Sequence, residues 1–137
     1  MMKHKFVEFI PKQKEDGILY ISLEYSTVVH KCACGCGLDV ITPISPHDWK
    51  IIYNGETITL HPSIGNWSYK CRSHYWIKNN NVVWANDFSD EQIKATREAD
   101  RHLKNKYFSE KQKVKTSKEI KEENFLSKLI RRIKGLF

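Results

Sequence analysis

Three of the four cysteines in the chain fall within the five-residue segment Cys32-Ala33-Cys34-Gly35-Cys36. The fourth, Cys71, lies far downstream. Thiolates are preferred zinc ligands, and a structural zinc ion takes four ligands in a tetrahedron with Zn–S bonds of about 2.3 Å. The sequence therefore predicts a zinc site formed by Cys32, Cys34, Cys36 and Cys71, which we call the cysteine cluster.

The backbone around this site has to depart from a flat strand. Residues i and i+2 of a strand lie about 6.6 Å apart, whereas sulfurs bound to one zinc ion lie under about 4 Å apart. Gly35 and Gly37 allow the chain to curl around the metal, because glycine adopts backbone conformations that other residues avoid.

Other uses of these residues stay open at the level of the sequence. Three thiolates and a water would make an open catalytic zinc site, whereas four thiolates close the site as a structural one. Iron–sulfur ligation is less favoured, because the usual cluster spacings differ. His74, three residues after Cys71, could instead be the fourth ligand and leave one cysteine as a free thiol nucleophile.

A second candidate for chemistry is Ser63, in the segment Leu60-His61-Pro62-Ser63-Ile64-Gly65-Asn66-Trp67. A serine nucleophile needs a base within hydrogen-bond reach. We predict that the cysteine cluster brings His74 beside Ser63 as that base, with His61 as the second choice. Ser63 could also be an ordinary turn serine, which is the commoner use of this residue in such a loop.

The remaining parts of such a site are less defined. An acyl-transfer site needs hydrogen-bond donors for an oxyanion. The backbone amides around Gly65, or the side chain of Asn66, are the candidates for that role. Asp48 is the candidate for the group that orients the histidine.

Three segments of the chain together resemble a bacterial family. They are, in order, Cys32-Ala33-Cys34-Gly35-Cys36-Gly37, the segment from Leu60 to Trp67, and Cys71-Arg72-Ser73-His74-Tyr75-Trp76-Ile77. They are similar to the BubE family, which is found in bacterial ubiquitination-like operons. The resemblance covers roughly residues 28–85.

The resemblance implies a zinc-stabilised serine peptidase similar to a deubiquitinase. Such an enzyme would cleave after the C-terminus of a bacterial ubiquitin-like protein, maturing its precursor or releasing its conjugates. Carried over to this chain, Ser63 would be the nucleophile and His74 its base. The alternative function is a zinc-binding adaptor module for protein or nucleic acid, without catalysis.

The net charge of +7 is concentrated near the C-terminus. Residues 111–137 hold nine Lys/Arg and three Glu, whereas residues 1–110 are nearly neutral. A near-neutral body is not typical of a nucleic-acid-binding domain. The resemblance implies a ubiquitin-like protein, with its precursor or conjugates, as the partner. We also expect a cytoplasmic protein with reduced thiols, since the chain has neither an apolar signal core nor a membrane span.

The elements that must position these residues are mostly strands, between residues 5 and 85. Residues 18–30 are rich in β-branched and aromatic side chains. Asn54-Gly55 predicts a two-residue type I′ hairpin turn, in which both positions need a positive φ. A second hairpin turn is predicted at residues 79–81. We expect an α+β fold: a small, mostly antiparallel β domain with a zinc knot, then one or two C-terminal helices.

The C-terminal third is predicted to be helical in two parts. Ser89-Asp90-Glu91-Gln92 matches a capping box, which predicts a helix on the surface of the sheet that ends near Tyr107. The polar residues 109–118 predict a linker. Residues 119–134 predict an amphipathic helix with a basic face, whose apolar face continues to Phe137.

We therefore expect two domains, residues 1–108 and 109–137. The tail, residues 119–137, could dock on an anionic membrane or on a partner protein. It could equally pack on its own domain or on a second copy.

Overall fold

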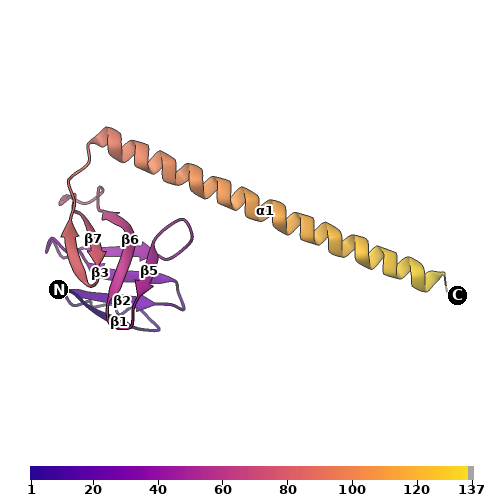
Figure 1. The fold of residues 1–137 in the computed structure, drawn as a ribbon, viewed down its shortest axis with the longest axis horizontal. Coiled ribbons are helices and arrows are strands. Elements are labelled where there is room, and N and C mark those ends of the chain that lie inside the picture. The colour runs from indigo at the N-terminus through magenta and orange to yellow at the C-terminus, as the bar shows by residue number, and fades with distance from the viewer. Residues whose placement is uncertain (136–137) are drawn as a thin grey trace. The chain divides into compact units, whose positions relative to one another are not determined.

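The computed structural model describes residues 1–135 of the chain, and in this part eight strands form two four-stranded sheets followed by one helix (Figure 1). The elements are β1 (Lys3–Phe6), β2 (Ile18–Ser22), β3 (Thr27–Lys31), β4 (Asp39–Pro43), β5 (Lys50–Tyr53), β6 (Ile58–Gly65), β7 (His74–Lys78), β8 (Asn81–Trp84) and α1 (Asp90–Lys134). The predicted α+β class is confirmed. Phe137, which we placed on the apolar face of the tail, lies outside the described residues.

Each sheet takes its strands in chain order, β1-β2-β3-β4 in the first and β5-β6-β7-β8 in the second. All neighbouring strands are antiparallel except β1 and β2, which are parallel. Short loops suffice for antiparallel neighbours, so a sheet order that follows the chain matches the closely spaced strands of this sequence.

The hydrophobic core lies between the two sheets and takes side chains from both. The first sheet contributes Leu19, Ile21, Val28 and Val40, and the second contributes Ile58, Leu60, Ile64, Tyr75 and Ile77. Cys32 belongs to the same buried group. The cysteine cluster is therefore anchored in the core at one residue, while Cys34 and Cys36 are exposed.

A buried polar pair joins the two sheets through this core. His30 on β3 is fully buried, and its Nε2 lies 2.8 Å from the hydroxyl of Tyr75 on β7. Burial lowers the pKa of His30 to about 4, because the charged imidazole loses its hydration. The same hydroxyl accepts a hydrogen bond from the backbone N–H of Ala33 at 3.4 Å. This contact ties the start of the cysteine loop to β7.

The two predicted hairpins are present. The geometry that we predicted for the first turn is found in the second turn instead. At the first hairpin Gly55 has a positive φ and Asn54 does not, so the predicted type I′ turn is wrong. The side chain of Asn54 instead accepts hydrogen bonds from the backbone N–H groups of Glu56 and Thr57, at 3.0 and 2.7 Å, as in an Asx turn.

The second hairpin turn, between β7 and β8, has the geometry that we predicted for the first. Asn79 and Asn80 both have positive φ, 48° and 62°. Lys78 pairs with Asn81 across the turn, which leaves two residues in the loop. Asparagine tolerates this left-handed region better than most residues, so an Asn-Asn pair serves where an Asn-Gly pair was expected.

The predicted capping box at the start of α1 is confirmed. The hydroxyl of Ser89 accepts a hydrogen bond from the backbone N–H of Gln92 at 3.3 Å, and the Gln92 side chain accepts one from the N–H of Ser89 at 2.8 Å. These bonds satisfy two backbone donors that the first turn leaves without intrahelical partners.

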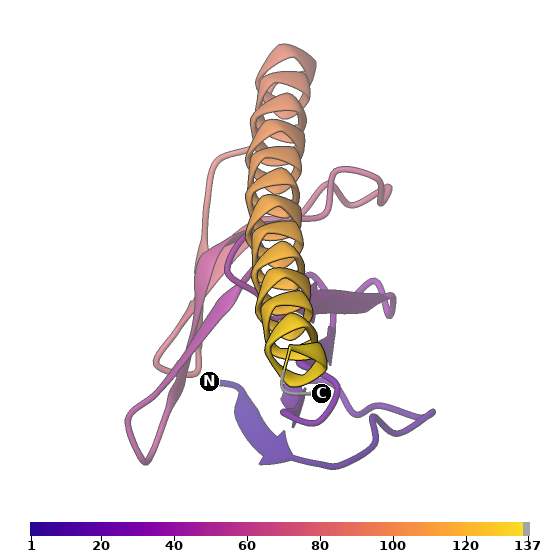
Figure 2. The same cartoon turned by 90° about the vertical axis from the view of Figure 1, so that its right-hand side faces the viewer.

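The predicted linker at residues 109–118 is wrong, because α1 runs through it without a break (Figures 1 and 2). This stretch is polar but contains neither glycine nor proline, and lysine, glutamate and glutamine are good helix formers. The polar residues 109–118 therefore form an exposed part of the helix and do not interrupt it. Ile93 is the one residue of α1 that is buried in the described part.

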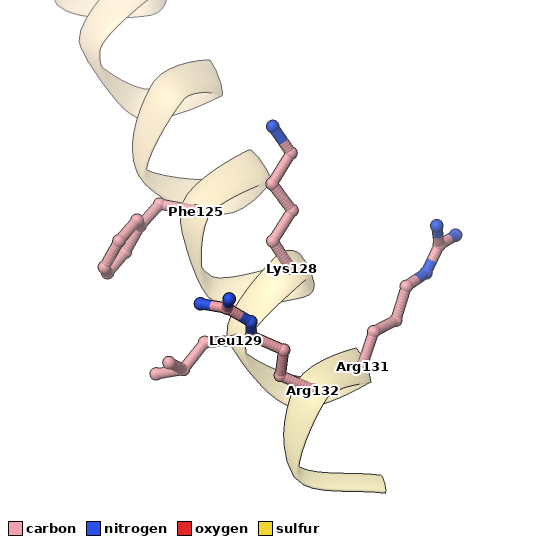
Figure 3. Close-up of a pocket in the computed structure, with 5 residues that line it drawn as sticks. All are labelled: Phe125, Lys128, Leu129, Arg131 and Arg132. Carbon is pink, nitrogen blue, oxygen red and sulfur yellow. The ribbon is translucent and has the colours of Figure 1, made fainter. Parts of the chain in front are cut away.

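The chain divides into two compact units, and the second begins at Lys94 within α1. All strands, the cysteine cluster and the candidate catalytic residues belong to the first unit. In the second unit, Figure 3 shows the end of the helix, where Phe125 and Leu129 project to one side and Lys128 and Arg131 to the other. The predicted domains, residues 1–108 and 109–137, stay a prediction.

Candidate functional site

Ser63 lies on a distorted part of β6. The pairing of β6 with β7 follows one register at Leu60 and a shifted register at Ile64, and Ser63 lies between the two. Such a bulge bends the strand and re-aims its side chains. The sequence suggested a loop at this position, and the structure has a bulged strand instead.

His74 is the first residue of β7, and it meets Ser63 across this bulge. Its Nε2 lies 2.9 Å from the Ser63 Oγ, and its Nδ1 lies 2.7 Å from the backbone carbonyl oxygen of Asn86. A carbonyl oxygen only accepts hydrogen bonds, so Nδ1 carries the proton and donates to Asn86. Nε2 is then the acceptor for the Ser63 hydroxyl.

This arrangement has the parts of a serine–histidine pair with a third, orienting group. A base on the second nitrogen can take the hydroxyl proton as the oxygen attacks a carbonyl carbon. In this site a main-chain carbonyl stands where serine hydrolases commonly have a carboxylate. Ser63 is partly exposed, while His74 is only 5% exposed. The Ser63 hydroxyl can therefore be reached from solvent, and the His74 imidazole is shielded from it.

The other two candidates for this chemistry lie elsewhere. Both nitrogens of His74 have partners other than Asp48, whose carboxylate accepts a hydrogen bond from the Ser45 hydroxyl at 2.7 Å. The expectation that Asp48 orients the histidine is therefore wrong. His61 is exposed on β6, opposite Lys50 of β5, and the structure pairs Ser63 with His74 instead.

Aromatic rings enclose His74. Trp67 and Phe88 both approach it edge-on, with ring centroids 4.8 and 4.7 Å from that of the imidazole. These two rings stack on each other at 5.2 Å, and Trp76 lies 5.8 Å from the imidazole. Such packing leaves the ring few other orientations, so it holds Nε2 toward Ser63.

Gly65 makes room for this aromatic packing. A Cβ atom at this position would lie 2.4 Å from the indole of Trp67, well inside van der Waals contact. Any larger residue would force a shift of this indole, which packs on His74. The sequence suggested Gly65 as an oxyanion donor, and the structure adds a steric reason for glycine.

Arg72 holds the segment that carries the orienting carbonyl. Its guanidinium donates to the carbonyl oxygen of Phe88 at 2.9 Å and forms ion pairs with Asp87 at 3.2 Å and Asp90 at 3.4 Å. Phe88 packs on His74, and Asn86 binds its Nδ1. Arg72 follows Cys71 directly, so one residue links the cysteine cluster to the histidine's supports.

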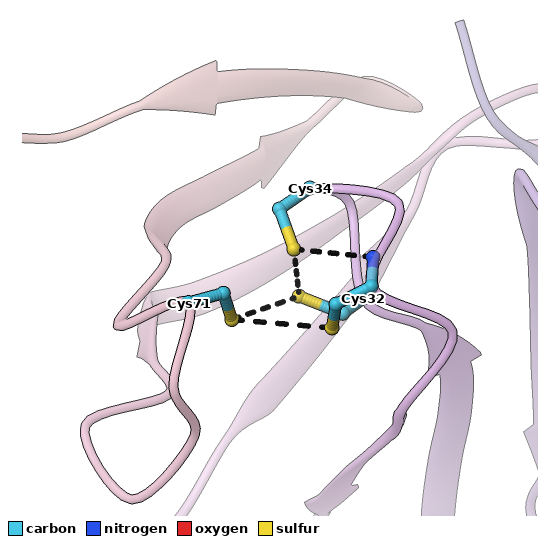
Figure 4. Close-up of side chains that lie close together, drawn as sticks. Cys32, Cys34 and Cys71 are labelled. Atoms are coloured by element: carbon cyan, nitrogen blue, oxygen red, sulfur yellow. Dashed lines mark hydrogen bonds between the residues drawn. The ribbon is translucent and has the colours of Figure 1, made fainter.

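The four cysteines come together as the sequence predicts. All four sulfurs lie within 4.8 Å of one another. Cys32 Sγ is 3.4 Å from Cys34 Sγ and 3.9 Å from Cys71 Sγ (Figure 4). Cys36 Sγ is 4.0 Å from Cys71 Sγ. Four thiolates around one zinc ion lie about 3.8 Å apart. The cluster could therefore hold a metal ion of this size.

The loop that carries three of these cysteines has the curled backbone that we predicted. Gly35 and Gly37 both have positive φ, 85° and 79°. The Cys32 carbonyl accepts from the N–H of Gly35 at 3.0 Å, which closes the turn. Figure 4 shows Cys34 reaching the cluster from this loop and Cys71 from the loop that leads into β7.

Ser73 and Asn66 form a shell of polar groups around the cluster. The hydroxyl of Ser73 lies 3.1 Å from Cys32 Sγ and 3.5 Å from Cys71 Sγ. Burial raises the pKa of Cys71, but hydrogen bonds with Ser73, Cys34 and Cys32 together outweigh it and leave the pKa at about 7. Groups that donate to ligand sulfurs in this way favour the thiolate that a metal binds.

Asn66 belongs to this shell and does not face Ser63. Its side-chain nitrogen donates to the Ser73 hydroxyl at 2.9 Å and lies 3.7 Å from Cys32 Sγ, and its backbone N–H donates to the Ser73 carbonyl at 2.9 Å. The sequence suggested it as an oxyanion donor because an amide follows Ser63 closely. The structure assigns that amide to the cysteine cluster.

Three supporting residues had no clear signal in the sequence. Asn86 contributes a backbone carbonyl, which any residue has. Arg72 and Ser73 stand between Cys71 and His74, so their place in the chain could have marked them as links between the cluster and the histidine. Residue type alone did not distinguish them.

A model of the family described as "Bacterial ubiquitination-like system serine protease (BubE)" matches residues 6–85. This range spans seven strands completely, together with Ser63, His74 and all four cysteines. No curated protein and no solved structure matches the chain significantly. Within the described residues, no helix has the length and apolar character needed to cross a membrane.

Proposed function

The chain belongs to the BubE family, and we propose that it is a zinc-stabilised serine peptidase that cleaves after the C-terminus of a bacterial ubiquitin-like protein. Either a precursor extension or a conjugated amine would be the leaving group. The observation that carries the proposal is the pair of hydrogen bonds on His74, 2.9 Å to Ser63 Oγ and 2.7 Å to the Asn86 carbonyl.

The proposed reaction is acyl transfer through Ser63. Its oxygen attacks the carbonyl carbon of the last residue of the ubiquitin-like protein while His74 Nε2 takes the hydroxyl proton. The C–N bond then breaks, and Nε2 gives that proton to the departing amine. Water attacks the resulting ester with His74 again as base, which releases the carboxylate and restores the Ser63 hydroxyl.

Two features support this division of roles. The Asn86 carbonyl keeps the proton on Nδ1, so that Nε2 is free to accept from Ser63. A carbonyl dipole stabilises the imidazolium less than a full carboxylate charge would. The aromatic rings around His74 help to hold the imidazole in position. We propose the backbone amides around Gly65 as the oxyanion donors, since the Asn66 side chain is bound to Ser73.

We propose zinc as the ion of the cysteine cluster and a structural role for it. Cys32, Cys34, Cys36 and Cys71 would fill all four tetrahedral positions, which leaves none for a water or a substrate. When bound, the ion supplies a cross-link between the loop after β3 and the loop before β7. The residues that follow Cys71 are then held in place, among them His74.

A cleavage assay with a ubiquitin-like precursor tests this function. The unmodified protein should release the C-terminal extension, and Ser63→Ala should lower kcat by at least about 10³-fold, as removal of a nucleophile does. Ser68→Ala, an exposed serine in the following loop, is the matched control and should keep its activity. Release of the extension is followed by mass spectrometry.

Two results would contradict the proposal. Cleavage that persists in Ser63→Ala would exclude the serine mechanism. Tight binding of ubiquitin-like proteins without cleavage of any precursor or conjugate would favour the adaptor function instead.

A further inference from the structure

The last turns of α1 carry an exposed apolar and basic surface that the proposed peptidase chemistry does not use. Residues 124–134 contain four Lys/Arg and no Asp or Glu. They also contain five large apolar side chains that are between 45% and 66% exposed: Phe125, Leu126, Leu129, Ile130 and Ile133. We call this stretch the terminal amphipathic segment.

The two kinds of side chain are segregated around the helix. At about 100° per residue the five apolar side chains fall on one arc of about 140°, and the cations occupy the rest. Figure 3 shows Phe125 and Leu129 on one side and Lys128 and Arg131 on the other. Arg132 stands beside one edge of the apolar arc, next to Phe125, and the basic residue Lys134 stands beside the other edge.

We propose that the terminal amphipathic segment docks on a membrane surface rich in anionic phospholipid. Its apolar arc would enter the boundary between headgroups and acyl chains with the helix axis along the surface. Lysine and arginine at the edges of such an arc can extend their charged ends to the lipid phosphates while their methylene stems stay against the acyl chains. An anionic phospholipid surface therefore matches both the apolar arc and the basic residues at its edges.

The charge distribution argues against a second copy of the chain as the occupant. In a helix pair, the residues that border the apolar seam of one helix face those of the other. Here both borders are basic, and the segment has no carboxylate to pair with them. Two copies would therefore place like charges opposite each other, whereas an anionic bilayer offers opposite charge along the whole helix.

Co-sedimentation of the full-length protein with vesicles tests this proposal. Vesicles of phosphatidylglycerol and phosphatidylcholine should sediment the protein, and vesicles of phosphatidylcholine alone should bind it much less. Each lysine or arginine near an anionic surface contributes about fivefold in binding, so Lys128→Gln/Arg131→Gln/Arg132→Gln should weaken partitioning by about 100-fold. Leu129→Gln/Ile133→Gln should also abolish sedimentation, because it interrupts the apolar arc.

The matched control is Lys111→Gln/Lys113→Gln/Lys115→Gln. It removes the same charge by the same substitution from the same helix, outside the terminal amphipathic segment, and should change partitioning by less than about threefold. Circular dichroism in buffer shows whether each variant keeps its helix. Ser127→Glu, which leaves every proposed contact residue in place, adds a negative charge to the basic face and should weaken binding as well.

Several results would overturn the proposal. These are no sedimentation with anionic vesicles, equal sedimentation with neutral ones, or equal losses in the two triple variants. Dimers that form without vesicles and dissociate in Leu129→Gln/Ile133→Gln, with no vesicle binding, would assign the apolar arc to a second copy. None of these results depends on cleavage by Ser63. This proposal can therefore fail while the proposed function stands, and the reverse also holds.

Discussion

At the scale of single residues, the site depends on how firmly one imidazole is held. His74 has a main-chain carbonyl on Nδ1 and three aromatic rings around it. A fixed ring keeps Nε2 at hydrogen-bond distance from Ser63 without a carboxylate. Small shifts of the surrounding rings should therefore affect turnover more than they affect folding.

Gly65 offers the sharpest test of this dependence. Gly65→Ala would place a methyl group 2.4 Å from the Trp67 indole, so the indole has to move and its packing on His74 changes. Misplacement of a catalytic group by about 1 Å can cost about 100-fold in rate, so we expect kcat for the precursor to fall by about 10- to 100-fold. Overpacking should cost about 1–3 kcal/mol in the free energy of unfolding.

The double variant Gly65→Ala/Trp67→Phe distinguishes this mechanism from a general defect. A smaller ring relieves the clash, so the effects of the two substitutions on kcat should be less than additive, as for residues in contact. Additive effects would show that Gly65 does not act through Trp67. Alanine keeps the backbone N–H of residue 65, so Gly65→Ala does not remove the proposed oxyanion donor. A loss of rate in this variant would therefore come from the clash with Trp67.

The chemically specific residue types were predictable, and their supports were not. Few other roles explain four cysteines at such spacing, and His74 is predictable beside Ser63 because it follows the predicted ligand Cys71 by three residues. Asn86 acts through its backbone, so its side chain gives no signal. Asn66 was assigned to the oxyanion because an amide suits either role, and only the geometry separates the two.

At the scale of elements, the segment between β8 and α1 connects the cysteine cluster to the histidine. Arg72 binds this segment at Asp87 and Phe88 and the start of α1 at Asp90, and the segment supplies both the Asn86 carbonyl and the Phe88 ring. Arg72 touches no reacting atom in the proposed mechanism. It is a positioning residue that acts through His74.

Replacement of Arg72 should reveal this role in the kinetics. We expect Arg72→Ala to lower kcat for the precursor by about 10- to 100-fold with little change in KM, as loss of a positioning contact does. Arg72→Lys should recover only part of the rate, because an ammonium group cannot reproduce the planar fork of the guanidinium. Metal content, measured by elemental analysis, should stay unchanged in both variants.

Lys70→Ala is the matched control for Arg72. It removes an exposed cation from the same loop, on the other side of Cys71, and should leave kcat unchanged. A rise in KM with constant kcat in Arg72→Ala would instead place Arg72 in substrate binding. Loss of metal from that variant would show that its effect passes through the cysteine cluster.

The elements themselves show where pattern reasoning succeeds. The β-branched and aromatic residues and the capping box have direct physical counterparts in the strands and in the start of α1. The turn at Asn54 and the bulge at Ser63 depend on tertiary contacts that a local pattern does not contain. The polar run at residues 109–118 predicts a break in the 45-residue helix, but it contains no glycine or proline that would stop a helix.

At the scale of the whole molecule, the proposed zinc ion would cross-link the loop after β3 to the loop before β7 within the first unit, which we call the β unit. A structural zinc ion contributes on the order of 10 kcal/mol to folding, which is comparable to the whole stability of a typical domain, about 5–15 kcal/mol. We therefore expect one zinc ion per chain. Its removal by a strong chelator should unfold the β unit. The near-UV circular dichroism signal and the cleavage activity should then both be lost.

Metal exchange separates a structural ion from a catalytic one. If the ion only cross-links the chain, Cd²⁺ should restore both the fold and the cleavage rate of the chelated protein, because four thiolates also bind this softer ion. Restored folding with a greatly changed rate would indicate that the ion takes part in the reaction. Less than half an equivalent of zinc in the purified protein would contradict the predicted site.

The most direct test of the proposed serine mechanism is covalent labelling by a fluorophosphonate, followed by peptide mass spectrometry. An activated serine displaces the fluoride and keeps the phosphonyl group on its oxygen. We predict one adduct per chain, on Ser63, that disappears in Ser63→Ala and forms much more slowly in His74→Gln. A protein that cleaves the ubiquitin-like precursor but carries no adduct on Ser63, or carries it on another residue, would contradict this assignment.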